Sequence, residues 1–175
     1  MKKYIDLWEY AGQILEQVGT AVLVTTKADG KVNTMTIGWG TLGVEWKKPL
    51  FTVFVRQSRY TKELLDKNGE FTINVHLKGT DRKQALGFCG SKSGRDVDKI
   101  KEMGLHLEEP DVISVPGIKE FPITLECRVV YKQDQDLNLL DEDKRLRYYE
   151  PGTANDGDYH TAYYGEVLAA YIIED

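Results

Sequence analysis

The feature that most constrains the fold is a succession of short segments rich in β-branched residues and separated by turn signals. Two of them, residues 20–27 and 32–37, flank Ala28-Asp29-Gly30-Lys31, a pattern typical of a β-hairpin. Further strands are expected at residues 50–55, 70–75, 123–131 and 162–173. About six strands with short connections predict a mainly β fold, an antiparallel barrel decorated by short helices.

Helices are expected between these strands. Apolar residues at helical spacing from Trp8 to Val18 predict an amphipathic opening helix, with Gly19 near its C-cap. The polar, Gly/Ser-rich residues 89–95 are expected to form a loop, and residues 134–158 a long excursion before the last strand. Shorter helices are expected at residues 59–68, closed by Gly69, at 81–88, and at 96–103, capped by Asp96.

Length and charge limit the class of function. The 175 residues suit one domain, 1–175, with no room for a separate nucleotide-binding unit, so any two-substrate chemistry must share one site. Apolar residues make up 41% of the chain and charged residues 29%, which are values of a globular protein. The formal charge of −5 argues against a nucleic-acid partner.

Membrane, disulfide and metal signals are absent from the sequence. No apolar run approaches the roughly 18 residues of a membrane-spanning helix, and the acidic start does not resemble a signal peptide, so a cytoplasmic protein is expected. Cys89 and Cys127 lie 38 positions apart without a CxxC pattern, which disfavours a disulfide framework. No HxxxH or HExxH spacing occurs, so no metal site is expected.

Residues 38–43 match GxGxxG, the fingerprint of dinucleotide-binding folds. In that fingerprint the third glycine opens a helix whose N-terminus binds the pyrophosphate. Here Val44-Glu45-Trp46-Lys47-Lys48-Pro49 leads to another strand within seven residues, so this interpretation is rejected. The glycines are interpreted as a wide connection between strands, or as a place where the backbone approaches a flat ligand near Trp39.

A candidate anion socket follows the third predicted strand. Arg56 and Arg59 add positive charge, Ser58 is placed to cap the next helix, and Thr61 adds a hydroxyl. A phosphate monoester suits such a group. The alternative is an ordinary helix cap with solvated arginines.

An unusually polar stretch, Asn33-Thr34-Met35-Thr36, lies on the second strand of the hairpin. Because side chains alternate along a strand, one polar pair would face the core unless a ligand or partner satisfies it. The alternative is a half-exposed strand in which threonine serves β propensity.

Two later segments also offer polar groups. The stretch from Cys89 to Lys99 combines flexible backbone, hydroxyls and three cations, which suits a phosphate or ribityl chain or, alternatively, a mobile surface loop. Cys89 lacks an activating histidine nearby and is interpreted as a packed or ligand-lining thiol. His160 follows an Asp/Gly-rich stretch where a strand begins, either lining a cleft or serving the structure.

The assembled pattern resembles the flavin reductase-like family, the FMN-binding split-barrel proteins that include the flavoredoxins. The likeness spans nearly the whole chain and lies in the order of its motifs. These are Asn33-Thr34-Met35-Thr36 with Trp39, Lys48-Pro49-Leu50, residues 54–61, residues 70–75, Cys89-Gly90 with residues 93–99, and His160 ahead of Gly165-Glu166-Val167.

The resemblance implies a Greek-key split barrel, a homodimer, and FMN bound near the subunit interface. It implies that Asn33, Met35, Thr36 and Trp39 line the isoalloxazine, that Arg56, Ser58, Tyr60 and Thr61 hold the phosphate, and that Cys89, Gly90, Ser93 and Lys99 form a second wall. His160 would approach the face where a nicotinamide or acceptor docks. An aromatic cover that relatives carry beyond the last strand would be missing here, or replaced by Tyr163 or Tyr164.

The leading hypothesis is therefore a flavoprotein oxidoreductase in which NAD(P)H reduces FMN and electrons pass to free flavin or a protein acceptor. The cofactor performs the chemistry, so Thr36 and His160 are expected to orient and polarise rather than to form an acid-base triad. One alternative is an FMN-binding electron carrier or flavin reservoir without NAD(P)H turnover. Another is a ligand-free barrel used only for association.

Overall fold

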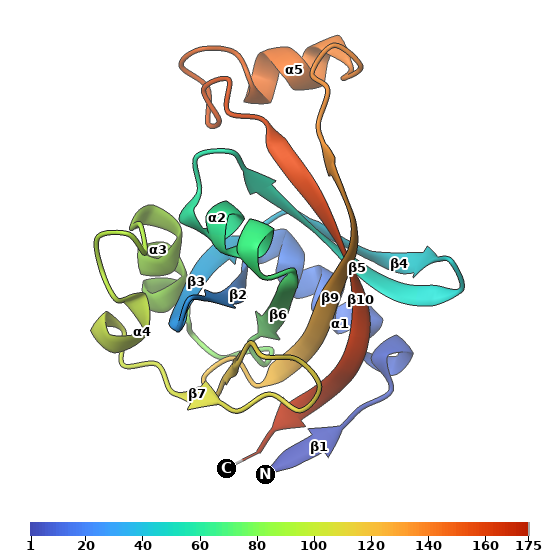
Figure 1. Cartoon of the computed structure of the whole chain (residues 1–175), viewed down its shortest axis with the longest axis vertical. Coiled ribbons are helices and arrows are strands. Elements are labelled where there is room, and N and C mark those ends of the chain that lie inside the picture. The colour runs from blue at the N-terminus through green and yellow to red at the C-terminus, as the bar shows by residue number, and fades with distance from the viewer. Residues whose placement is uncertain (175) are drawn as a thin grey trace.

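A computed structural model describes residues 1–174, and an antiparallel sheet forms its centre (Figure 1). In the described part of the chain eight strands pair in the order β3-β2-β6-β9-β10-β5-β4, with β1 added beside β10, and β7 and β8 form a separate ribbon. The strands are β1 (Lys2–Tyr4), β2 (Val22–Ala28), β3 (Lys31–Ile37), β4 (Gly40–Glu45), β5 (Lys48–Arg56), β6 (Glu70–Val75), β7 (Leu107–Glu108), β8 (Gly117–Ile118), β9 (Ile123–Asp134) and β10 (His160–Ile173). The predicted mainly β class and antiparallel pairing are confirmed.

The hairpin signal is also confirmed. Ala28 pairs with Lys31, and the two residues between them, Asp29 and Gly30, have φ angles of 50° and 75°. Two consecutive residues with positive φ match the twist of the flanking strands, which is why Asp-Gly favours this turn.

Five short helices surround the sheet in the described residues, and the opening helix is where the sequence predicts it. Asp6 caps that helix by accepting from the Trp8 N–H, and the helix continues to Thr20 with Ala21 as C-cap. The C-cap expected near Gly19 is therefore wrong by two residues. The helices are α1 (Leu7–Thr20), α2 (Tyr60–Lys67), α3 (Lys83–Ser91), α4 (Lys99–Glu102) and α5 (Glu142–Tyr148).

Three local predictions are corrected. Residues 89–91 belong to α3, so the loop begins at Lys92. The predicted Asp96 cap is wrong because α4 starts at Lys99, where Asp98 accepts from the Lys101 N–H. The glycine-rich residues 38–43 are only partly a connection, since Gly40 starts a strand paired with β5. No helix follows them, which confirms the rejection of a dinucleotide fingerprint.

The core lies inside the curved sheet. Phe51, Phe71, Leu125 and Tyr163 are fully buried in its larger cluster. Strand β10 bends past Phe71 at Gly165, where a Cβ atom would lie 2.4 Å from the Phe71 ring and the register with β9 shifts. A glycine is required there because any side chain would overlap the core.

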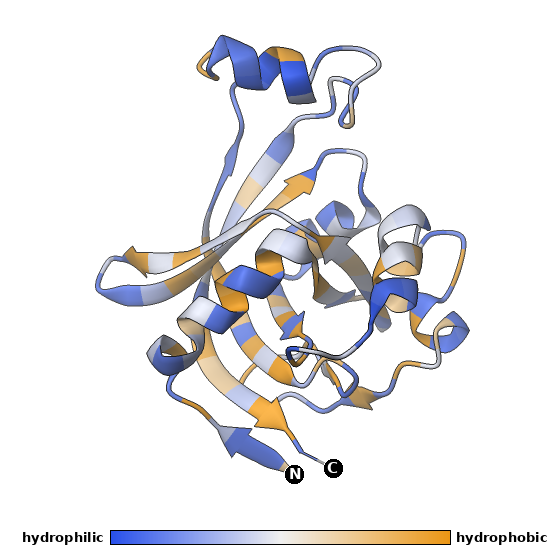
Figure 2. Cartoon of the chain, turned by 180° about the vertical axis from the view of Figure 1, so that it is seen from behind, coloured by the Kyte–Doolittle hydropathy of each residue, from blue (hydrophilic) through white to orange (hydrophobic). Residues whose placement is uncertain are grey.

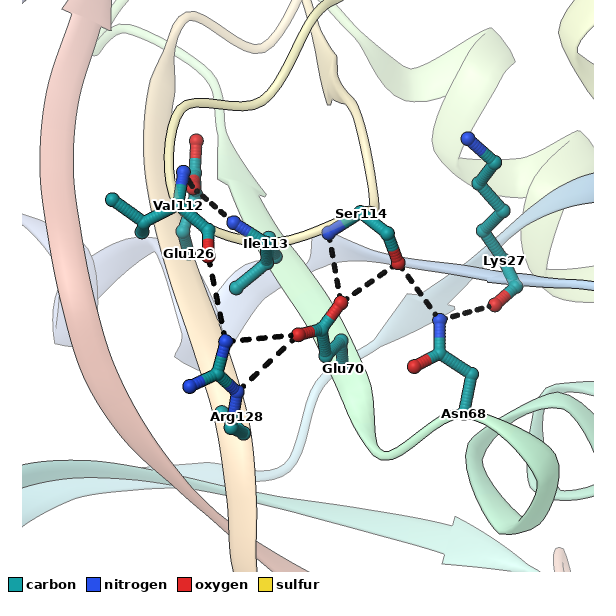
Figure 3. A network of polar contacts seen from close by, with 8 residues as sticks. All are labelled: Lys27, Asn68, Glu70, Val112, Ile113, Ser114, Glu126 and Arg128. Atoms are coloured by element: carbon teal, nitrogen blue, oxygen red, sulfur yellow. Dashed lines mark hydrogen bonds and ion pairs between the residues drawn. The ribbon is translucent and has the colours of Figure 1, made fainter.

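Two carboxylates of the sheet hold the loop between β7 and β8 (Figure 3). The fully buried Glu126 accepts from the backbone N–H groups of Asp111 and Val112 at 2.8 Å each, and from the Tyr171 hydroxyl at 2.9 Å. Glu70 accepts from the Ser114 N–H at 2.8 Å and pairs with Arg128 at 3.2 Å. We call Glu126 and Glu70 the carboxylate clamp.

The excursion between β9 and β10 forms an arm. Both strands extend beyond the body of the barrel and α5 joins them at the far end (Figure 1), where most residues are hydrophilic (Figure 2). Residues 149–159 then return to β10, which starts at His160 opposite Arg56 of β5. The arm thereby brings its last residues to the start of α2. Among residues 1–174, the helices are all too short or too polar to cross a membrane.

Candidate functional site

A cavity of about 180 Å³ opens where β3, β5 and the returning arm meet. One side is apolar and the other carries two guanidinium groups, so the walls differ in chemistry. We call this the central cavity. Its lining residues are Met35, Thr36, Ile37, Gly38, Trp39, Phe54, Arg56, Arg59, Asn155 and His160.

The candidate anion socket lies at the polar side of this cavity and already holds a carboxylate of the chain itself. The Ser58 N–H donates to Asp158 Oδ1 at 3.3 Å, and the Ser58 hydroxyl donates to Asp158 Oδ2 at 2.5 Å. The Arg56 guanidinium donates to the Ala154 carbonyl at 3.2 Å. Ser58 therefore already binds an anionic oxygen, and Arg56 donates to a neutral one beside it.

The predicted capping role of Ser58 is wrong. Helix α2 has Arg59 at the N-cap position and no side-chain cap, because the Ser58 hydroxyl bonds to Asp158 instead. Burial lowers the pKa of Arg59, and the neighbouring Arg56 lowers it further. Two like charges held this close favour a bound anion.

His160 forms the wall beside the arginines. Burial lowers the pKa of His160 to about 4, and Arg56 adds to that shift, so the ring is neutral near pH 7. Its Nδ1 atom lies 2.8 Å from the Tyr149 hydroxyl, and its ring centre lies 5.0 Å from that of Trp39. His160 is thus a neutral, oriented hydrogen-bonding group.

The polar side chains of β3 differ in whether they have hydrogen-bond partners. Thr34 is paired inside the sheet, since the Thr25 hydroxyl donates to its Oγ1 at 3.1 Å. Asn33 donates through Nδ2 to the Thr61 hydroxyl at 3.1 Å, yet its buried Oδ1 has no hydrogen-bond partner among residues 1–174. Thr61 in turn donates to Met35 Sδ at 3.6 Å. An unpaired buried acceptor is costly, so Asn33 is the residue of this polar stretch that would gain from a ligand.

Thr36 is half-buried and its hydroxyl donates to the Leu86 carbonyl at 2.6 Å. The contact ties β3 to α3, and Gly90 allows it, because a Cβ atom at Gly90 would lie 3.3 Å from Thr36 Cβ. The remaining lone pairs of the Thr36 hydroxyl are available to a donor in the central cavity.

A second cavity of about 500 Å³, the lateral cavity, opens beside the central one and is lined in part by Asn33, Tyr60 and Lys99. Lys99 is buried and donates to the carbonyls of Thr34 at 3.0 Å and Cys89 at 2.8 Å, so it joins α4 to β3. Burial lowers the pKa of Lys99. The Lys99 ammonium group is therefore already used in hydrogen bonds that hold the fold.

The residues predicted for the site are therefore not all together. Five predicted residues line the central cavity, namely Met35, Thr36, Trp39, Arg56 and His160. Three line the lateral cavity, Asn33, Tyr60 and Lys99, while Ser58, Thr61, Cys89, Gly90 and Ser93 line neither. The proposed contacts of all of them with a cofactor stay predictions.

Cys89 and the two candidate aromatic covers lie away from the central cavity. Cys89 is fully buried beside Leu23 and Phe121, and burial raises the pKa of its thiol. Tyr163 is buried and donates to Asp66 at 2.8 Å, and Tyr164 packs against Tyr131. Cys89 is therefore packed in this cluster, and its contact with a ligand stays a prediction.

The structure adds residues that sequence reasoning missed. Phe54 lies two positions before Arg56 on β5, so strand alternation could have placed both on one face. Asn155 and Tyr149 come from the arm, whose sequence carries no regular pattern. A third, outer cavity of about 430 Å³ shares Gly38, Trp39, Phe54 and His160 with the central one. These four residues therefore line both cavities, which lie next to each other.

The arrangement suits a ligand with an anionic end and a flat apolar part. Arg56, Arg59 and the Ser58 N–H serve the anionic end, while Met35, Trp39 and Phe54 offer apolar surface. Within residues 1–174, no group of three or more His, Cys, Asp or Glu side chains is arranged to hold a metal ion.

Known proteins resemble this chain in sequence and in fold. The family model described as flavin reductase like domain matches residues 17–175. A solved flavoredoxin from Methanosarcina acetivorans is 28% identical, with a TM-score of 0.65, over 88% of this chain and 68% of its own. A solved FMN-binding domain of a flavin reductases-like enzyme from Shewanella baltica shares the split-barrel fold, with a TM-score of 0.67 and 20% identity over 98% of this chain and 77% of its own.

Among curated sequences, an uncharacterized protein of Archaeoglobus fulgidus is 34% identical over 100 residues. The match covers 57% of this chain and spans just over half, 55%, of that relative.

Proposed function

The chain belongs to the flavin reductase-like family, and on that premise we propose that it is an FMN-binding oxidoreductase that passes electrons from NAD(P)H to free flavin or a protein acceptor. The observation that supports this most is the socket at Ser58 and Arg56, which holds an anionic group at the edge of an apolar-walled cavity.

The residues present fit FMN in chemistry. Ser58 would bind the phosphate, because it already donates two hydrogen bonds to a carboxylate, and Arg56 and Arg59 would add positive charge beside it. Trp39, Phe54 and Met35 would contact the ring system. Asn33 Oδ1, buried and unpaired among the described residues, would accept from a ring N–H or a ribityl hydroxyl.

When bound, FMN supplies a ring that accepts a hydride from NAD(P)H and releases electrons to an acceptor. The chain itself binds, orients and excludes water. Since the Tyr149 hydroxyl is a good donor to His160 Nδ1, we assign the single ring proton of the neutral His160 to Nε2. This N–H and the Thr36 hydroxyl orient ligands on the two sides of the cavity.

The shared lining residues give a reason to expect two ligands. Gly38, Trp39, Phe54 and His160 line both the central and the outer cavity. A nicotinamide or acceptor in the outer cavity would contact the same residues as the flavin. One short chain thereby serves both ligands without a separate nucleotide domain.

A second candidate, an FMN-binding electron carrier without NAD(P)H turnover, is favoured by the likeness to the flavoredoxin from Methanosarcina acetivorans. The two candidates share the FMN site and differ in whether NADH or NADPH reduces the bound flavin.

Titration of FMN into the purified protein, followed by steady-state oxidation of NADH and NADPH, tests the proposal. Replacing Arg56 with alanine (R56A) should weaken FMN binding about tenfold to a hundredfold, because a charge-assisted contact contributes about 1.5 to 3 kcal/mol. Lys101 is exposed on α4 and does not line the central cavity, so K101A is the matched control. Equal FMN affinity in R56A and K101A would contradict the phosphate site.

We further propose a homodimer. Exposed aromatic and apolar side chains on α1 and on the β4–β5 hairpin, Trp8, Leu15, Val44 and Trp46, support a contact surface there. Light scattering should give twice the mass of one chain, and W46K should shift the mass toward the monomer. A monomeric wild type would contradict this. The cytoplasmic location expected from the sequence stays a prediction.

A further inference from the structure

The start of α2 is covered by the chain's own arm. Asp158 accepts two hydrogen bonds from Ser58, through its N–H and its hydroxyl. Four residues earlier, the Ala154 carbonyl accepts from Arg56. Two oxygen acceptors of the arm therefore occupy the donors that would meet the phosphate of FMN.

We propose that Asp158 is a specificity-determining residue that competes with the flavin phosphate for Ser58 and the two arginines, so that FMN is held as an exchanging ligand. The inference rests on the proposed function, because it concerns the same site. FMN would then be a substrate that enters and leaves the site, and not a permanently bound cofactor.

The electrostatics of the site support competition. The negative charge of Asp158 acts on both neighbours, since it raises the pKa of Arg59 and of His160 against the lowering effect of burial. A dianionic phosphate placed on the same donors would repel this carboxylate at short range. Either the phosphate or the Asp158 carboxylate holds the socket.

The local backbone lets the carboxylate leave. Asp158 is half-buried. In the described part of the chain, its side chain accepts hydrogen bonds from the N–H and the hydroxyl of Ser58. It follows a tight turn in which Asp156 and Gly157 have φ angles of 47° and 75°, closed by the Asp158 N–H donating to the Asn155 carbonyl at 2.7 Å. Releasing Asp158 breaks surface contacts of the arm and no core packing.

Comparison with riboflavin isolates the contribution of the phosphate to affinity, because riboflavin carries the same ring and ribityl chain without a phosphate. Asp158 should oppose FMN and leave riboflavin unaffected. The ratio of the two affinities therefore reports on the competition and cancels effects on the ring site.

The experiment measures the dissociation constants of FMN and riboflavin by flavin fluorescence for wild type, Asp158→Asn, Asp158→Ala and Asp143→Asn. Asp143 is exposed on α5, so D143N removes the same charge from the arm without touching Ser58. We expect D158N and D158A to bind FMN about tenfold more tightly, from loss of the competing carboxylate. Riboflavin affinity should stay within about twofold, and D143N should change neither.

The outcomes are distinguishable. If wild type and variants bind neither flavin, the proposed function fails and the inference with it. If FMN binds and the FMN-to-riboflavin ratio is the same in D158N and wild type, the inference alone fails.

Thermal unfolding checks that each variant is folded. If both Asp158 variants are unfolded, NMR spectra of the wild-type protein test the competition instead. The Asp158 amide resonance should move on addition of FMN and keep its position on addition of riboflavin. Equal shifts with both flavins would overturn the competition.

Discussion

Two regions of this molecule use a carboxylate to hold a loop, and they do so with opposite consequences. In the carboxylate clamp, the fully buried Glu126 accepts from several backbone N–H groups and from Tyr171. At the socket, the half-buried Asp158 bonds to Ser58 beside Arg56 and Arg59. Each oxygen of the Glu126 carboxylate accepts two hydrogen bonds, whereas the Asp158 carboxylate accepts only from Ser58 among the described residues.

The difference shows how the same interaction can serve structure or ligand exchange. A buried carboxylate with all its acceptor positions filled cannot leave without stranding donors. A half-buried carboxylate held by one residue, as Asp158 is held by Ser58, leaves donors that a phosphate can take over. We therefore expect loss of the clamp to affect stability, and loss of Asp158 to affect ligand affinity.

The largest expected effect is on the clamp. Glu126→Gln replaces a charge-assisted acceptor by an amide whose NH₂ faces backbone N–H donors, so the free energy of unfolding should fall by about 3 kcal/mol. Urea unfolding measures this, with the exposed Glu102→Gln as control. FMN affinity of the folded protein should not change. A loss below about 0.5 kcal/mol would mean that the loop is held by other contacts.

The second prediction concerns His160, a buried group in which burial and the charge of Arg56 outweigh the opposing effect of Asp158 on the pKa. Its pKa of about 4 in the folded protein lies below the usual 6.5, so between these values the unfolded chain binds the extra proton. Lowering the pH from 7 to 5 should therefore destabilise the fold by about 2 kcal/mol through this group, and no such effect should appear above pH 7.

Urea unfolding of wild type and His160→Gln at pH 7 and pH 5 isolates that contribution. Wild type should lose more stability than the variant between the two pH values. The same loss in both proteins would show that His160 titrates at its ordinary pKa.

The smallest effect is expected for Asp158 itself. Asp158→Asn should change the free energy of unfolding by less than about 0.5 kcal/mol, because the residue is at the surface and its contacts are outside the core. Chemical denaturation of D158N beside E126Q gives the comparison directly. If D158N were as destabilised as E126Q, the two carboxylates would have the same structural role.

The strands and the socket could be predicted because their signals are local. Alternation and β-branched runs placed β2, β3, β5 and β6 within about two residues of their observed bounds, and the charges around Ser58 were read from one short segment.

The arm could not be predicted in the same way. Its contribution depends on long-range contacts, such as Tyr149 with His160 and Asp158 with Ser58, which leave no periodic pattern in the sequence. The prediction that Ser58 caps α2 is wrong for the same reason, because its hydroxyl bonds to Asp158, a residue 100 positions away. Lys99 likewise looked like a free cation, whereas two backbone carbonyls already accept from it.

The central claim is that the flavin phosphate binds at Ser58, and amide NMR tests it most directly. On addition of FMN, the Ser58 amide resonance should move, because its N–H exchanges the Asp158 carboxylate for a phosphate oxygen. The Ser114 amide, held by Glu70, should keep its position. An unchanged Ser58 resonance at saturating FMN, with shifts gathered elsewhere on the chain, would contradict the account.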